Sequence, residues 1–124
     1  MCYGDLGSFG TTDINTPNID QLALEGMKFT EFYSASPVCN PSRAALMTGR
    51  YPVRMGIYGV FFPESYYGID STEITIAELL QNAGYATGHI GKWHLGSRYD
   101  YLPLQNGFDE YSGIRYLNDM SQVM

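Results

Sequence analysis

The sequence has little cysteine, little positive charge and no long apolar run. Of its 124 residues only 2 are cysteines and 7 are Lys or Arg, against 13 Asp or Glu, so the net charge is −6. Two cysteines do not make a disulfide framework, and no Cys/His spacing indicates a zinc site. The acidic balance argues against binding to nucleic acid or acidic membranes. No segment is long and apolar enough to span a membrane, and no signal peptide is recognisable.

The composition is that of a folded domain. Hydrophobic residues make up 44% of the chain and charged residues 16%, which excludes a disordered polypeptide. The length suffices for one small domain with a core. The 14 glycines and 11 tyrosines suit a region rich in loops.

Residues 38–50 form the most informative stretch and predict a loop that becomes a short helix. Asn40 is a good N-cap, and Gly49 is the expected left-handed stop. Cys39 would then lie just outside a helix N-terminus, where free N–H groups and the helix dipole favour an anion. Arg43, one turn further, adds a cation. This pattern predicts a catalytic corner; the alternative is a small buried cysteine and a surface arginine.

Two elements are predicted in the N-terminal part of the chain. Thr16, followed by proline, predicts the start of a helix that ends at Gly26. The aromatic-rich segment 27–33 predicts a strand. The preceding glycine-rich residues read as a loop, in which Asp5 is a turn former or, alternatively, a metal ligand. The apolar residues that share one face of the helix are Ile19, Leu22 and Ala23.

Residues 74–84 carry the best local signal for a helix. Thr75 and Glu78 have the spacing of a capping box, and Gly84 ends the segment. Residues 85–91 read as a short strand, so helix and strand together predict an αβ unit of a parallel or mixed sheet. The residues predicted to form the buried stripe of this helix are Ile76, Leu79, Leu80 and Ala83.

A second chemical cluster follows that strand. In open α/β sheets ligands lie beyond the carboxyl ends of strands, which is where Lys92 and His94 fall. In extended chain the two side chains project to the same side, so a cation and a proton-transfer group would face one anion. The alternative is a solvated lysine and a structural histidine. We expect His89, inside the strand, to be structural, and Tyr66 and Tyr67 either to line a substrate entrance or to pack on the surface.

Both clusters resemble the signatures of one family. The run Cys-x-Pro-Ser-Arg from Cys39, followed by Thr48-Gly49-Arg50, resembles the first signature of the type I sulfatases. The run Gly-Lys-Trp-His-Leu-Gly that contains Lys92 and His94 resembles the second signature. Residues 51–56 resemble the arylsulfatase A-like branch.

The resemblance implies a fold. We expect an α/β structure, a partial alkaline-phosphatase-like sulfatase domain with a mixed, mostly parallel sheet flanked by helices. Residues 1–124 would be the N-terminal portion of the catalytic domain, without its first strand and its C-terminal part. Leu117 stands where many members carry a serine that lines the site, so one hydrogen bond there would be lost.

The resemblance also implies the roles of four residues. Cys39 matches the precursor of formylglycine, whose hydrate attacks sulfur and is a ligand of Ca²⁺. Arg43 matches the residue that orients the hydrate, and Lys92 matches one that touches hydrate and sulfate. His94 matches the group that is hydrogen-bonded to the hydrate and helps to expel the sulfate. The other calcium ligands would lie outside these 124 residues, so we expect the chain alone to be inactive.

The activity implied is that of a sulfuric ester hydrolase. Its partners would be a sulfate ester (an aryl sulfate or a sulfated sugar or lipid) and the formylglycine-generating enzyme. Two alternatives stay open: a phosphonate monoester hydrolase of the same superfamily, and a non-catalytic, truncated sulfatase-like binding protein. The sequence itself indicates no compartment, whereas the family implies a lysosomal, secreted or periplasmic protein.

Overall fold

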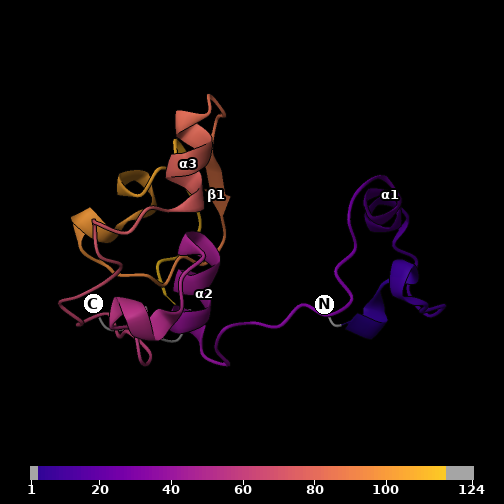
Figure 1. Cartoon of the computed structure of the whole chain (residues 1–124), viewed down its shortest axis with the longest axis horizontal. Helices are drawn as coiled ribbons and strands as arrows, with labels where there is room; N and C mark the ends of the chain where they lie inside the picture. The colour runs from indigo at the N-terminus through magenta and orange to yellow at the C-terminus, as the bar shows by residue number, and fades with distance from the viewer. Residues whose placement is uncertain (1–2, 117–124) are drawn as a thin grey trace. The chain divides into compact units, whose positions relative to one another are not determined.

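The structure, a computed structural model, describes residues 3–116 (Figure 1). Cys2 and Leu117 lie outside the described residues. The chain divides into two compact units, Met1–Tyr33 and Ser34–Met124, and each is described by itself. Among the described residues, no helix has the length and apolar character needed to cross a membrane.

The first unit is built around helix α1 (Pro17–Glu25), which begins after Thr16 and ends before Gly26, as predicted. The Thr16 side chain makes no capping bond to the helix; its hydroxyl accepts from Gly7 N–H at 3.0 Å and lies 3.1 Å from the Asp20 carboxylate. Thr16 therefore links the helix to the preceding turns. Those turns are two short 3₁₀ helices, η1 (Tyr3–Asp5) and η2 (Gly7–Phe9).

The strand predicted over residues 27–33 is wrong, because that segment has no regular structure. Its aromatic side chains are exposed; Tyr33, for example, is 80% accessible. A strand is stable only when its backbone groups pair with a neighbour, and the described residues provide none here. The apolar face of α1 is likewise not covered, since none of its residues is buried.

The second unit contains helices and a small parallel sheet. Strand β1 (Gly88–Ile90) pairs in parallel with β2 (Glu110–Ser112), with His89 opposite Tyr111. This confirms an α/β architecture with parallel pairing, although β1 is shorter than the predicted strand over 85–91 and the sequence did not predict β2. The other elements are α2 (Cys39–Thr48), η3 (Pro52–Met55), α3 (Ile76–Asn82), η4 (Tyr99–Tyr101) and η5 (Pro103–Gln105).

Helix α3 has the predicted capping box but not the predicted buried stripe. Thr75 Oγ1 accepts from Glu78 N–H at 3.2 Å, and the Glu78 carboxylate accepts from Thr75 N–H at 2.7 Å. The four residues of the predicted stripe are all exposed, and Ala77 is the buried residue. The helix packs through Ala77 on Gly107, where a Cβ would lie only 2.4 Å from Glu78 N. Backbone contact with this loop therefore decides which face is buried.

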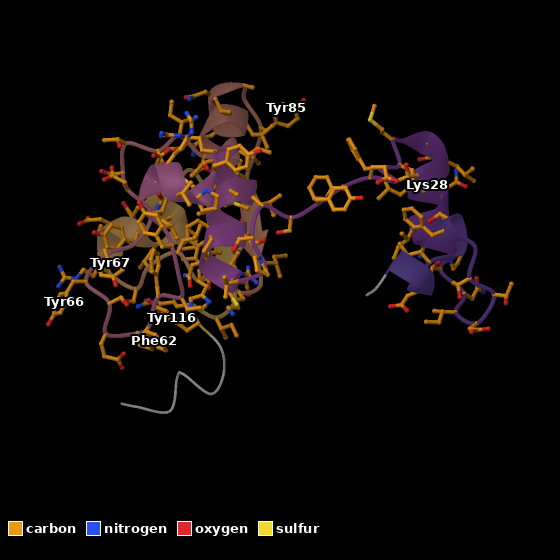
Figure 2. The ribbon with its side chains drawn as sticks, turned by 60° about the horizontal axis from the view of Figure 1, so that its bottom comes forward. Lys28, Phe62, Tyr66, Tyr67, Tyr85 and Tyr116 are labelled. Carbon is orange, nitrogen blue, oxygen red and sulfur yellow. The ribbon has the colours of Figure 1, made fainter. Side chains whose placement is uncertain are left out.

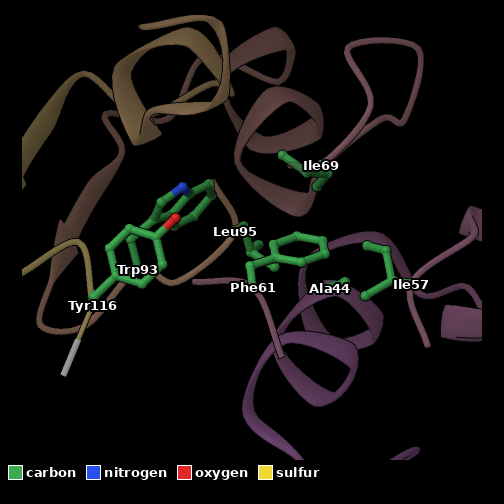
Figure 3. Close-up of a cluster of buried hydrophobic side chains, with 7 residues drawn as sticks. All are labelled: Ala44, Ile57, Phe61, Ile69, Trp93, Leu95 and Tyr116. Atoms are coloured by element: carbon green, nitrogen blue, oxygen red, sulfur yellow. The ribbon is translucent and has the colours of Figure 1, made fainter. Parts of the chain in front are cut away.

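The core of the second unit lies between α2 and the chain that follows β1 (Figure 3). Trp93 is its largest side chain, and the indole N–H donates to Tyr101 C=O at 2.7 Å. Packing this core fixes the position of α2 relative to residues 91–96. The buried members are Ala44, Ile57, Phe61, Ile69, Trp93, Leu95 and Tyr116.

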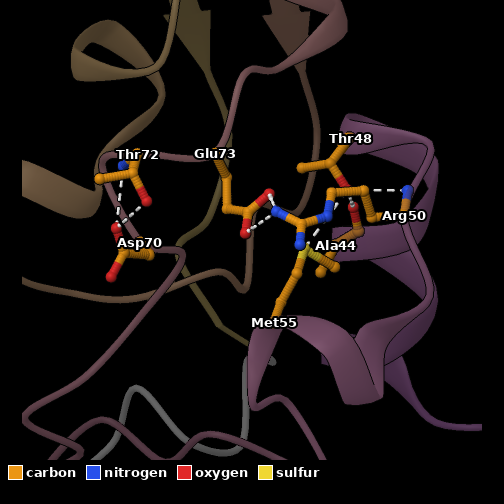
Figure 4. Close-up of polar contacts among 7 residues, drawn as sticks. All are labelled: Ala44, Thr48, Arg50, Met55, Asp70, Thr72 and Glu73. Atoms are coloured by element: carbon orange, nitrogen blue, oxygen red, sulfur yellow. Dashed lines mark hydrogen bonds and ion pairs between the residues drawn. The ribbon is translucent and has the colours of Figure 1, made fainter.

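An ion pair holds the end of α2 against the following loop (Figure 4). The Arg50 guanidinium donates to both oxygens of Glu73, at 2.5 and 2.6 Å. The Glu73 side chain is 8% exposed and that of Arg50 is 49% exposed. Loss of the ion pair would therefore leave the carboxylate buried without a cation, whereas the guanidinium can be solvated. Arg50, which belongs to the first signature, therefore has a structural contact.

Candidate active site

Cys39 is the first residue of α2, two positions further into the helix than the sequence predicted. Val38 is the N-cap, with extended backbone, whereas Asn40 is helical. Asn40 does not cap the helix because its buried side chain makes two hydrogen bonds to other segments. The amide nitrogen donates to His94 C=O, and the amide oxygen accepts from Phe61 N–H at 2.7 Å. Gly49 ends the helix at φ 67°, as predicted.

Lys92 is brought to Cys39 from the second signature. Its ammonium nitrogen lies 3.6 Å from Cys39 Sγ, within hydrogen-bonding distance of sulfur. The Arg43 guanidinium donates to Lys92 C=O at 2.6 Å. The first two turns of α2 thus present the cysteine and also hold the backbone of the lysine that contacts it.

Two glycines determine the backbone conformation at the ends of the second signature. Gly91 at φ 119° and Gly96 at φ 125° adopt conformations that side chains disfavour. Between them Trp93 and Leu95 are buried in the core, which anchors the segment. The predicted extended alternation of Lys92 and His94 is wrong, because His94 has φ 62°. Packing and local turns therefore place these two side chains.

His94 is completely buried. Its Nε2 lies 2.9 Å from Phe61 C=O, and its ring meets that of Tyr116 edge to face with centroids 4.8 Å apart. Burial lowers the pKa of His94 below its ordinary value, and the positive charges of Lys92 and Arg43 act in the same direction. The neutral imidazole is favoured, which suits a group that accepts a proton.

The remaining candidate side chains pack against residues other than Cys39. The His89 ring stacks on Tyr111 and packs against Trp93 and Phe108, which is a structural environment. Tyr66 and Tyr67 are exposed, on the same side of the second unit (Figure 2). Tyr66 lies under the Arg98 guanidinium, 4.6 Å away, and Tyr67 packs edge to face on Phe61. These contacts agree with surface packing.

Comparison with known proteins identifies the family. The family model described as Sulfatase matches residues 1–123. The chain belongs to the sulfatase family. Human arylsulfatase A is 52% identical over 120 residues, a match that covers 94% of this chain and 24% of that protein. Human N-acetylgalactosamine-6-sulfatase is 47% identical over 121 residues, with coverage of 91% and 23%. The chain therefore spans about a quarter of the length of these sulfatases.

Solved sulfatase structures share the fold. The crystal structure of Ps i-CgsB superposes with a TM-score of 0.80 at 46% identity, covering 90% of this chain and 25% of that one. PsFucS1 sulfatase from Pseudoalteromonas sp. gives a TM-score of 0.75 at 39% identity, covering 94% and 24%. The partial alkaline-phosphatase-like α/β domain expected from the sequence is confirmed.

The described residues do not by themselves fit a calcium site. Within residues 3–116, no three or more His, Cys, Asp or Glu side chains group together in a way that could hold a metal ion. Calcium takes six to eight oxygen ligands, and Cys39 as formylglycine would supply only one side chain.

The structure adds three residues that the sequence did not predict at the site. The sequence predicts Asn40 as a helix cap, and it gives Phe61 and Tyr116 no individual role. Phe61 and Tyr116 contact the His94 ring, and Asn40 bonds the backbone of both Phe61 and His94. No local pattern in the sequence indicates this arrangement, because tertiary contacts bring the three residues together.

Proposed function

We propose that residues 1–124 are the N-terminal portion of the catalytic domain of a sulfuric ester hydrolase. The single observation that carries this proposal is the contact between the two signatures, with Lys92 Nζ 3.6 Å from Cys39 Sγ at the N-terminus of α2. Such a corner favours an anionic group through an ammonium and a helix end together. Membership of the sulfatase family supports a sulfate ester as that group.

In this proposal Cys39 is converted to formylglycine by a formylglycine-generating enzyme. The Cys39 sulfur marks the position that an oxygen on the same Cβ would take. As its hydrate, the modified residue supplies the hydroxyl oxygen that bonds to the sulfur atom of the ester, while the S–O bond to the alcohol breaks and the alcohol leaves with a proton. The second hydroxyl then loses its proton, the aldehyde reforms and the sulfate is released. Cys39 is half-buried and is not in a disulfide, which leaves it available for modification before folding is complete.

The neighbouring residues would bind the anion and move protons. The Lys92 ammonium neutralises negative charge that grows on the reacting group. Arg43 fixes the Lys92 backbone through its bond to the carbonyl and adds positive charge one helical turn after Cys39. His94, neutral and buried, is the group suited to accept a proton.

The substrate class is drawn from the relatives. Their names refer to an aryl sulfatase and to a sulfatase of N-acetylgalactosamine 6-sulfate, and a structure of Ps i-CgsB holds k-i-k-neocarrahexaose. We propose an aryl sulfate or a sulfated sugar for this protein. A calcium ion, if it polarises the sulfate as the family implies, needs ligands from outside the described residues.

The test is hydrolysis by the parent protein, meaning the proposed longer protein that contains this chain. Release of sulfate from an aryl sulfate would be compared with hydrolysis of the matching aryl phosphonate monoester. The proposal predicts the higher kcat/KM on the sulfate. A higher kcat/KM on the phosphonate would assign the parent to the phosphonate monoester hydrolases. If neither ester were hydrolysed, the result would favour the non-catalytic binding protein.

A further inference from the structure

The Asn40 side chain is a polar group with no solvent contact, and it joins two distant segments. Its exposed fraction is 0%. The amide nitrogen donates to His94 C=O, and the amide oxygen accepts from Phe61 N–H at 2.7 Å. A buried amide is tolerated only when such bonds are made, so this residue is fixed by its partners and fixes them in return.

Its two partners are also bonded to each other. His94 Nε2 lies 2.9 Å from Phe61 C=O. A carbonyl oxygen only accepts, so this bond requires the proton on Nε2. A neutral ring then carries no proton on Nδ1, which is buried and has no hydrogen-bond partner among the residues that the structure describes. The ring is thereby left with one free acceptor.

The backbone of His94 needs support from its surroundings. Its φ of 62° lies in the left-handed region, which a residue other than glycine adopts at a cost. His94 N–H donates to Arg115 C=O at 2.8 Å, and His94 C=O accepts from Asn40. Asn40 therefore supplies the bond on the carbonyl side of the strained residue.

We propose that Asn40 is a positioning residue that holds His94 in the tautomer protonated on Nε2. By fixing Phe61 N–H and His94 C=O at once, it sets the distance between the Phe61 carbonyl and the His94 ring. The importance of the tautomer for turnover rests on the proposed function. The assignment of the tautomer does not rest on the proposed function, because three hydrogen bonds within this chain set the tautomer.

The test is the tautomer of His94 in the 124-residue chain, read from ¹⁵N chemical shifts of labelled histidine. The chain has 2 histidines, so His94→Gln assigns both sets of signals. Asn40→Asp keeps an acceptor for Phe61 N–H but removes the donor to His94 C=O. We expect the ratio of Nε2–H to Nδ1–H tautomers to fall about threefold to tenfold, the factor expected for one lost hydrogen bond.

Asn106→Asp is the matched control. Asn106 is 3% exposed, and its amide nitrogen also donates to a backbone carbonyl, that of Leu102 at 2.8 Å. This variant makes the same chemical change at another buried asparagine and should leave the His94 tautomer ratio unchanged. Asn40→Leu, of similar size without polar atoms, should lower the ratio as Asn40→Asp does.

Three results would overturn the inference. The first is a wild-type His94 that is mainly protonated on Nδ1 or has the tautomer ratio of a free peptide. The second is a tautomer ratio that is unchanged in both Asn40 variants. The third is a change of the His94 tautomer ratio in Asn106→Asp that equals the change in Asn40→Asp. In the parent protein, Asn40→Asp should lower kcat about tenfold with KM within twofold. A parent without sulfatase activity would contradict the proposed function alone, since the tautomer is measured without turnover.

Discussion

The ammonium nitrogen of Lys92 lies 3.6 Å from the sulfur of Cys39, although the two residues are 53 positions apart in the chain. The contact depends on two supports: the Arg43 bond to Lys92 C=O, and the burial of Trp93 and Leu95 on either side of His94. Both supports come from residues of the two signatures. The signatures are therefore one structural unit, in which the helix presents Cys39 and the loop presents Lys92.

Replacement of Lys92 tests the charge at this corner. Lys92→Gln in the parent protein should lower kcat on a sulfate ester by about 10²- to 10³-fold, because the charge that stabilises the developing anion is lost. The free energy of unfolding should change by less than about 0.5 kcal/mol, since the side chain is not part of the core. Steady-state kinetics and urea denaturation measure the two effects.

The chain's other lysine provides the control. Lys28 belongs to the first unit and donates to Ser8 C=O at 2.7 Å. Lys28→Gln should retain kcat. An equal loss of kcat in the two variants would show that general charge, and not the position of Lys92, is responsible.

The Arg50–Glu73 pair tests the structural role of the first signature's last residue. Arg50→Met would leave the Glu73 carboxylate, 8% exposed, without its cation and should lower the free energy of unfolding by about 1–3 kcal/mol. Glu73→Gln should cost less, because Arg50 can turn to water. The exposed Arg54 is the control, and Arg54→Met should stay within about 0.5 kcal/mol. Equal stabilities of all three variants would contradict this role.

The buried His94 predicts a pH dependence of stability. Its pKa is lowered in the folded state, so below about pH 6.5, the ordinary pKa of histidine, the unfolded chain binds a proton that the folded chain does not. The free energy of unfolding should therefore decrease as the pH falls from about 6.5 towards the folded pKa, by at most about 1.4 kcal/mol per pH unit. Denaturation in urea at several pH values measures this slope.

Two variants isolate the contribution of His94. His94→Gln should remove the slope that begins below about pH 6.5, whereas His89→Gln should retain it. The lowered pKa values of Asp70 and Asp109 act only at lower pH, near and below about 3.9. A slope that persists in His94→Gln would assign the effect to another group.

The 124-residue chain should neither hydrolyse sulfate esters nor respond to calcium. The described residues supply no group of metal ligands, so addition of calcium should leave the thermal unfolding midpoint unchanged. Differential scanning calorimetry with calcium and with a chelator measures this, and magnesium serves as the control cation. A calcium-dependent rise of the midpoint, or sulfate release by this chain, would contradict the assignment of the remaining ligands to the rest of a longer protein.

Local signals in the sequence predicted local structure well. The capping box at Thr75 and Glu78, the proline after Thr16 and the glycine stop at Gly49 act through neighbouring residues, and the structure confirms each. The parallel pairing of an αβ unit was also predicted. These features depend on backbone preferences that a few adjacent residues determine.

Features that depend on distant residues were not predicted. Asn40 suits a helix cap locally, but Phe61 and His94 engage its side chain, and the helix begins two residues earlier than predicted. The apolar stripe of α3 is exposed because the helix packs through Ala77 on the Gly107 loop. The segment 27–33 has strand composition but no partner strand among the described residues. Tertiary contacts, which no local pattern encodes, decide all three.

The most direct test of the account is the rate of sulfate release by the parent protein and by its Cys39→Ser variant, with residue 39 identified by mass spectrometry in both. We expect formylglycine at position 39 of the active wild-type protein. The variant should keep the fold, because the two side chains differ little in size, and lose at least about 10³-fold in kcat. Cys2→Ser, the chain's other cysteine, should retain activity. A Cys39→Ser protein with wild-type turnover would contradict the account.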